Sequence, residues 1–157
     1  MSGSTKDLDA LVRRASRIAE QQFKKCDGEI VAFWLVENAD GEQGIIGVPR
    51  MPKDGADKDK LAANLSEIFQ EEGVRRCVAV LPMWFGSSRD CRPSEDPDRK
   101  EGVMFFAEDD RGARHGMREI IRSSAGARLG KLEFFDKPPF GRFVGLLSAA
   151  RSGATVQ

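Results

Sequence analysis

The stretch that decides the fold begins with CVAVLPMWF (residues 77–85) and ends with VMFFA (residues 103–107). Both runs are apolar, short and rich in β-branched or aromatic residues, which favours buried β-strands over helices. Between them, residues 86–102 are polar and carry nine charged side chains together with Cys91. We therefore expect two central strands, residues 76–85 and 103–107, that are joined by a long charged loop.

The N-terminal part of the chain predicts one helix followed by two strands. Apolar residues recur at spacings of three and four over residues 6–23, which is typical of an amphipathic helix. Residues 29–37 form a nearly unbroken apolar run that predicts a buried strand. The sequence NADG (residues 38–41) indicates a turn, and residues 44–48 then form the returning strand of a hairpin. Two glycines in that returning strand indicate a bulge or a close backbone approach.

The rest of the chain predicts a second helix, further strands and a last helix. Asp57 or Asp59 can cap the second helix, and Gly73 ends it. After the two central strands, residues 114–122 and 129–135 give two further strand candidates, separated from their neighbours by turn signals. The last element is expected to be a short amphipathic helix over residues 142–151.

These elements define a fold class because strands follow one another through tight turns more often than they alternate with helices. The order is α-β-β-α-β-β-β-β-α. Such runs of strands predict an α+β domain with a mainly antiparallel sheet of about six strands. We expect the helices to pack on one face of this sheet.

The length and composition indicate one domain in a reducing compartment. A chain of 157 residues is long enough for a single core, which we assign to residues 6–151, with residues 1–5 and 152–157 as flexible termini. Its three cysteines, Cys26, Cys77 and Cys91, are widely spaced and favour free thiols over a disulfide framework. No apolar segment has the length of a signal peptide or a membrane span, so we expect a cytoplasmic protein without a membrane partner.

Charge is unevenly distributed although the net charge is zero. Residues 111–157 contain nine Lys and Arg against three Asp and Glu, a net charge of +6. Arg114, Arg118 and Arg122 have even spacings, so on a strand they share one face and could form a basic stripe for nucleic acid. The scarcity of aromatic residues around them and the zero net charge favour a solvated polar face instead.

The charged loop contains the candidates for catalysis. Asp96 and Asp98 with His115 and Cys91 could serve a small metal-dependent hydrolase acting on a phosphate-containing substrate, with Arg118 or Arg122 holding the anion. None of these residues has a diagnostic spacing, however. Arg89, Arg92 and Arg99 are interleaved with the loop acids, and weak ion pairs within a solvated loop explain the composition equally well.

The absence of a complete catalytic motif favours binding over catalysis. We expect a non-catalytic binding or adaptor domain that contacts a macromolecular partner through the charged loop and a sheet face. Its binding candidates are all arginines: Arg89, Arg92, Arg99, Arg114, Arg118 and Arg122. A protein partner is favoured over nucleic acid, and the sequence predicts neither a cofactor nor a metal site. Oligomeric state is left open.

Overall fold

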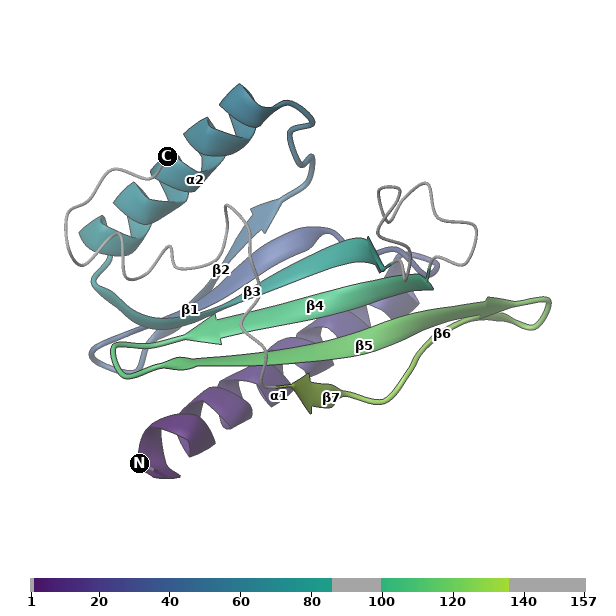
Figure 1. Ribbon diagram of the computed structural model, residues 1–157, viewed down its shortest axis with the longest axis horizontal. Helices are drawn as coiled ribbons and strands as arrows, with labels where there is room; N and C mark the ends of the chain where they lie inside the picture. Colours follow the sequence, from purple (N-terminus) through teal and green to yellow (C-terminus); the bar gives the residue numbers. More distant parts are fainter. Residues whose placement is uncertain (1, 86–99, 136–157) are drawn as a thin grey trace.

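The helices and strands follow one another in the order expected from the sequence (Figure 1). The computed structural model describes residues 2–85 and 100–135. Its elements are α1 (Ser2–Lys25), β1 (Ala32–Asn38), β2 (Gln43–Val48), α2 (Gly55–Glu71), β3 (Val74–Phe85), β4 (Lys100–Glu108), β5 (Ala113–Ser123), β6 (Gly126–Leu129) and β7 (Glu133–Phe135). The α+β class is confirmed. The expected helix over residues 142–151 lies outside the described residues.

All strands belong to one antiparallel sheet in the order β2-β1-β3-β4-β5-β6, and β7 also pairs with β5. The two apolar runs of the deciding stretch form β3 and β4, which pair directly in the middle of the sheet, Val80 opposite Phe105. The predicted single strand over residues 129–135 is two strands. Its chain turns away after Leu129, where the Gly130 amide donates to the Glu119 carbonyl at 2.7 Å.

The two described helices cover opposite faces of the sheet, and the expectation that they share one face is wrong. In β1, Phe33 and Leu35 pack in the cluster formed with α1, whereas Ala32 and Trp34 pack in the cluster formed with α2. Alternate residues of a strand point to opposite faces. An unbroken apolar run therefore makes both faces hydrophobic, so each needs its own cover, and Figure 1 shows α1 behind the sheet.

The second helix begins earlier than the sequence pattern indicates. Asp54 is the N-cap, because its side chain accepts a hydrogen bond from the Asp57 amide at 2.7 Å. The prediction that Asp57 or Asp59 caps the helix is therefore wrong, and the helix begins about one turn earlier. Gly73 follows the helix with φ of 63°, a conformation that a residue with a Cβ rarely adopts, and so ends the helix as expected.

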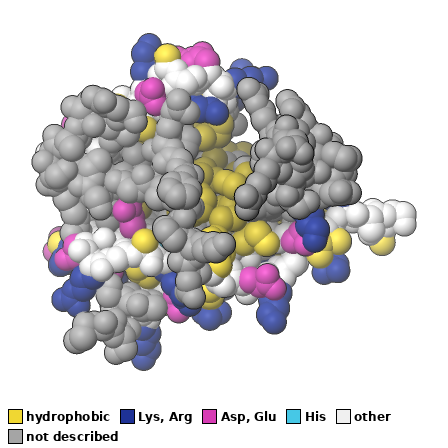
Figure 2. Space-filling view, in the orientation of Figure 1, with side chains coloured by type: hydrophobic (Ala, Val, Ile, Leu, Met, Phe, Trp, Pro, Cys, Tyr) yellow, Lys and Arg dark blue, Asp and Glu magenta, His cyan; other side chains and the backbone are white. Residues whose placement is uncertain are grey.

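Neither described helix has the combination of length and apolarity that crossing a bilayer requires. The long helix α1 is amphipathic instead, and its buried residues all lie toward β3, β4 and β5. Figure 2 shows hydrophobic side chains gathered over the middle of the opposite face of the sheet.

Candidate binding surface

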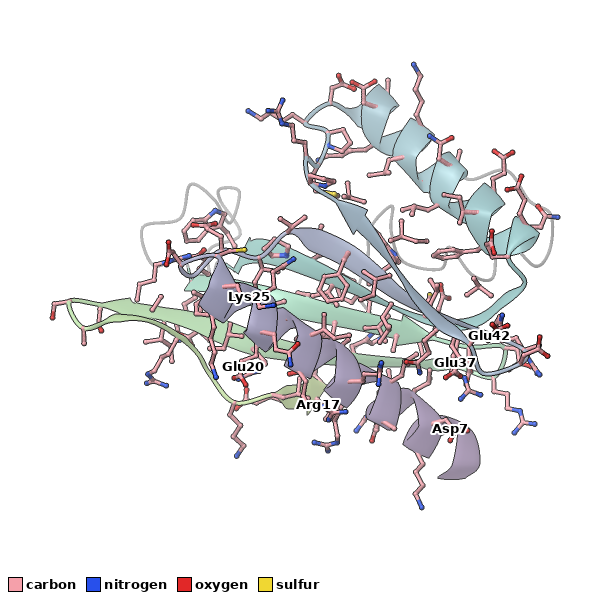
Figure 3. All side chains as sticks on the ribbon, turned by 180° about the vertical axis from the view of Figure 1, so that it is seen from behind. Asp7, Arg17, Glu20, Lys25, Glu37 and Glu42 are labelled. Carbon is pink, nitrogen blue, oxygen red and sulfur yellow. The ribbon has the colours of Figure 1, made fainter. Side chains whose placement is uncertain are left out.

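The three arginines of β5 share one face, and that face lies against α1. Each guanidinium binds a carboxylate: Arg114 Nε is 2.7 Å from Asp9 Oδ1, Arg118 Nη2 is 2.9 Å from Glu20 Oε1, and Arg122 Nε is 2.6 Å from Glu101 Oε1. Asp9 and Glu20 belong to α1, whereas Glu101 belongs to β4. Figure 3 shows Glu20 on the side of α1 toward β5 and the segment that follows β6.

Arg118 is the most enclosed of the three, with 12% of its side chain exposed. Besides Glu20 it donates to the Gly130 carbonyl at 2.6 Å and to the Ser16 hydroxyl at 3.1 Å. These contacts join α1, β5 and the segment after β6. Hydrogen bonds between charged groups contribute more to stability than neutral ones, so Arg118 fastens the helix to the sheet. A role for these arginines in binding a partner stays a prediction.

The pKa values of the partner groups follow from the same contacts. The hydrogen bond from Arg118 lowers the pKa of the Glu20 carboxyl, and that from Arg122 lowers the pKa of the Glu101 carboxyl. The hydrogen bond to Glu101 in turn raises the pKa of Arg122. Each pair is therefore held in its charged form at neutral pH.

His115 lies on the other face of β5, away from the acidic partners of these arginines. Its ring lies between Phe106 at 6.0 Å and Phe135 at 5.9 Å, and only 6% of the residue is exposed. Burial lowers the pKa of the imidazole, and the nearby charge of Arg114 lowers it further. Its buried Nδ1 has no hydrogen-bond partner among the described residues. In this part of the chain His115 is a neutral packing residue.

The loop candidates lie outside the described residues. This applies to the possible catalytic residues Cys91, Asp96 and Asp98 and to the possible binding residues Arg89, Arg92 and Arg99. Within residues 2–85 and 100–135, no three His, Cys, Asp or Glu side chains are grouped closely enough to hold a metal ion. Among the described residues, His115 therefore has no contact with a carboxylate that could form a catalytic pair.

A groove that the sequence did not indicate lies between β2 and the C-terminal half of α2. It has a volume of about 430 Å³. Its lining is mixed: Val36, Ile46, Ile68 and Val74 contribute apolar side chains, and Asn38, Glu42, Gln43 and Glu72 contribute polar ones. Ile68 is 36% exposed, whereas Leu65 and Phe69 of the same helix are buried. The groove therefore offers a partly apolar surface beside β2, the strand at one edge of the sheet.

Strand β2 forms the outer edge of the sheet, and no described strand pairs with its outer side. The Asn38 amide donates to the Glu42 carbonyl at 3.0 Å, so these two residues form a hydrogen-bonded pair across the hairpin. Hydrogen-bonded pairs alternate along an antiparallel ladder. Gly44, Ile46 and Val48 consequently bond to β1, whereas Gln43, Ile45 and Gly47 turn their amide and carbonyl groups toward the free edge.

Within residues 2–85 and 100–135, the free edge lacks the features that usually protect such a strand. Edge strands commonly carry charged side chains, prolines or bulges. The sequence of β2, QGIIGV, has no charge and no proline, and its pairing with β1 is continuous. Ile45 is 56% exposed, the highest value among the large hydrophobic side chains described. The bulge that the two glycines indicated is not present between β1 and β2.

Gly44 and Gly47 lie on opposite faces of β2, and only Gly44 lines the groove. A Cβ on Gly44 would meet Val36 at 3.8 Å, an ordinary contact, and a Cβ on Gly47 would meet no described atom within 4 Å. Neither glycine has a positive φ. The two glycines are visible in the sequence of β2. The groove also depends on the position of α2, which local sequence patterns do not predict.

Comparison with known proteins adds no relative: the chain matches no protein-family model, and neither a curated protein nor a solved structure resembles it significantly.

Proposed function

We propose that the chain is a non-catalytic binding domain that adds an extended segment of a protein partner to the free edge of β2. The observation that carries the proposal is the uncharged, exposed edge beside a partly apolar groove. Strand addition supplies affinity through main-chain hydrogen bonds, and a neighbouring pocket for alternate side chains supplies specificity. The edge position of β2 and the groove beside it support this mode of binding.

The position of the groove supports this mode of binding. In an antiparallel pair, residues directly opposite each other point to the same face. A partner residue opposite Gly44 therefore points toward the α2 side, where Gly44 has no side chain and the groove begins. A partner residue opposite Ile45 would pack against an isoleucine that is otherwise exposed.

The rival functions lack comparable support among the described residues. The arginines proposed for nucleic acid or for a substrate anion are bound to acids, and His115 lies between two phenylalanine rings. The charged loop over residues 86–99 lies outside the described residues, so strand addition at β2 is proposed without it.

The proposal is tested with peptides selected from a displayed random library and measured by fluorescence polarisation against two variants. Ile45→Pro removes an amide that faces the free edge, and proline is tolerated at such positions. Ile45→Thr keeps the amide and shortens the side chain. We expect Ile45→Pro to weaken binding about tenfold, the loss of one hydrogen bond, while Ile45→Thr changes it less. Equal binding by Ile45→Pro and the unaltered chain would refute strand addition at β2.

A further inference from the structure

The groove beside β2 is acidic at one end. Glu42 lines it from the β1–β2 turn, and Glu72 lines it from the C-terminal end of α2. Figure 3 shows Glu42 and Glu37 at this turn, beneath the end of α2. None of the described residues that line the groove is Lys or Arg. The charged side chains that line the groove are therefore all acidic, whereas Val36, Ile46, Ile68 and Val74 contribute its apolar surface.

The end of α2 adds to this negative potential. The carbonyl groups at the C-terminus of a helix carry a partial negative charge that is usually offset by Lys or Arg. The last turn of α2 contains no basic residue, and both Glu71 and the C-cap Glu72 are acidic. This arrangement is unfavourable for the isolated helix. A cation bound at the end of the groove would offset it.

We infer that the segment bound at β2 carries a lysine or arginine two positions from an apolar residue. This inference rests on the proposed strand addition. Side chains two positions apart in an extended segment point to the same face and are about 7 Å apart. An apolar residue opposite Gly44 enters the groove over Ile46 and Val36. The residue opposite Glu42, two positions away, then lies on the same face at the acidic end.

Charge complementarity favours a segment of another protein over a second copy of this chain as the strand bound at β2. The edge strand of a second copy, QGIIGV, contains no basic residue to place between Glu42 and Glu72, and Arg50 comes only after Pro49, beyond the end of that strand. A partner with an apolar and a basic residue at alternate positions complements both parts of the groove. Self-association through β2 is thus a competing outcome that the test must detect.

The probe is a set of acetylated, amidated octapeptides of alternating Thr and Val, with Lys placed at each position in turn. Matched sets carry Gln or Glu instead. We expect the best Lys peptide to bind about fivefold more tightly than its Gln counterpart, because two partly exposed ion pairs contribute modestly, and the Glu peptide to bind most weakly. The preference should decrease as salt is raised.

The protein variant that tests the groove is Glu42→Gln combined with Glu72→Gln. This variant should bind Lys and Gln peptides equally. The matched control is Glu29→Gln with Glu133→Gln, which removes the same charge from residues that do not line the groove and should keep the preference.

The possible failures are distinguishable. Equal binding of Lys and Gln peptides by the unaltered chain, with binding still lost in Ile45→Pro, overturns the basic residue but leaves strand addition intact. Absence of binding by every peptide overturns both proposals. Concentration-dependent dimerisation in sedimentation, abolished by Ile45→Pro, makes a second copy the occupant and overturns the inference.

Discussion

Arg118 of β5 donates to Glu20 of α1 across the interface between helix and sheet, with Nη2 2.9 Å from Oε1. The same guanidinium binds Ser16 and the Gly130 carbonyl, so one side chain joins three segments that are distant in sequence. The arginine that looked from the sequence like part of a ligand-binding stripe thus has extensive contacts inside the fold.

Replacing Arg118 should lower stability. Arg118→Ala removes three hydrogen bonds from a side chain that is mostly enclosed, and we expect the free energy of unfolding to fall by about 2–3 kcal/mol. Chemical denaturation monitored by circular dichroism measures this. Arg128→Ala is the control, because Arg128 is exposed on β6 and its loss should change stability by no more than about 0.5 kcal/mol. Similar effects of the two substitutions would argue against the fastening role of Arg118.

His115 should make stability depend on pH between neutrality and the acid range. Its pKa is lowered in the folded state, so the unfolded chain binds a proton first as pH falls below about 6.5. Stability should therefore decrease as pH falls from the imidazole pKa of the unfolded chain through the lower pKa of the folded chain. Above the pKa of the unfolded chain, His115 should not make stability depend on pH. Because the chain has one histidine, its imidazole resonances report the titration directly by NMR.

The control for this pH dependence is His115→Leu, which removes the titrating group and a buried nitrogen without a partner. We expect this variant to lose the His115 part of the slope. At pH 7 its stability should lie within about 1 kcal/mol of the original, because an unsatisfied polar atom is removed together with some packing. A folded-state imidazole pKa at or above its ordinary value would contradict the described environment.

Gly44 and Gly47 provide a matched pair for testing the groove. Gly44→Leu places a side chain in the groove, whereas Gly47→Leu places the same side chain on the opposite face of the same strand. We expect peptide binding to weaken about tenfold or more only in Gly44→Leu, since steric exclusion from a groove removes the buried contact. Thermal denaturation should show both variants folded. Equal loss in both would mean that the groove side of β2 is not the specific contact.

The acidic end of α2 should be a site where binding and stability oppose each other. Glu72→Lys replaces an unfavourable charge at the helix C-terminus with a favourable one, so the unbound protein should gain roughly 0.3–1 kcal/mol of stability. The same substitution should weaken binding of Lys-containing peptides. Calorimetry and fluorescence polarisation on one preparation measure the two effects. A variant that is less stable, or that binds these peptides more tightly, would contradict the role of Glu72.

The fold class followed from the sequence because the signals that define it are local. Apolar runs at 77–85 and 103–107, and the turn at 38–41, determine strands and their antiparallel connection. The face on which each helix packs is not local. It depends on β1 having hydrophobic side chains on both faces, with Phe33 packing toward α1 and Trp34 toward α2.

The candidate surface was harder to predict for the same physical reason. The even spacing of Arg114, Arg118 and Arg122 correctly gives a shared face, but their acidic partners Asp9 and Glu20 are about one hundred residues away in sequence. The groove likewise combines β2 with the distant end of α2. Its two local signals, the glycines and the absence of charge in β2, indicate an unusual strand without revealing what lies beside it.

Amide hydrogen exchange along β2 tests the central claim most directly. In the unbound protein, Gly44, Ile46 and Val48 should exchange slowly because they bond to β1, while Gln43, Ile45 and Gly47 should exchange quickly at the free edge. Strand addition predicts that a bound peptide slows exchange at these three edge amides in particular. Binding that leaves Gln43, Ile45 and Gly47 exchanging as fast as before would contradict the account.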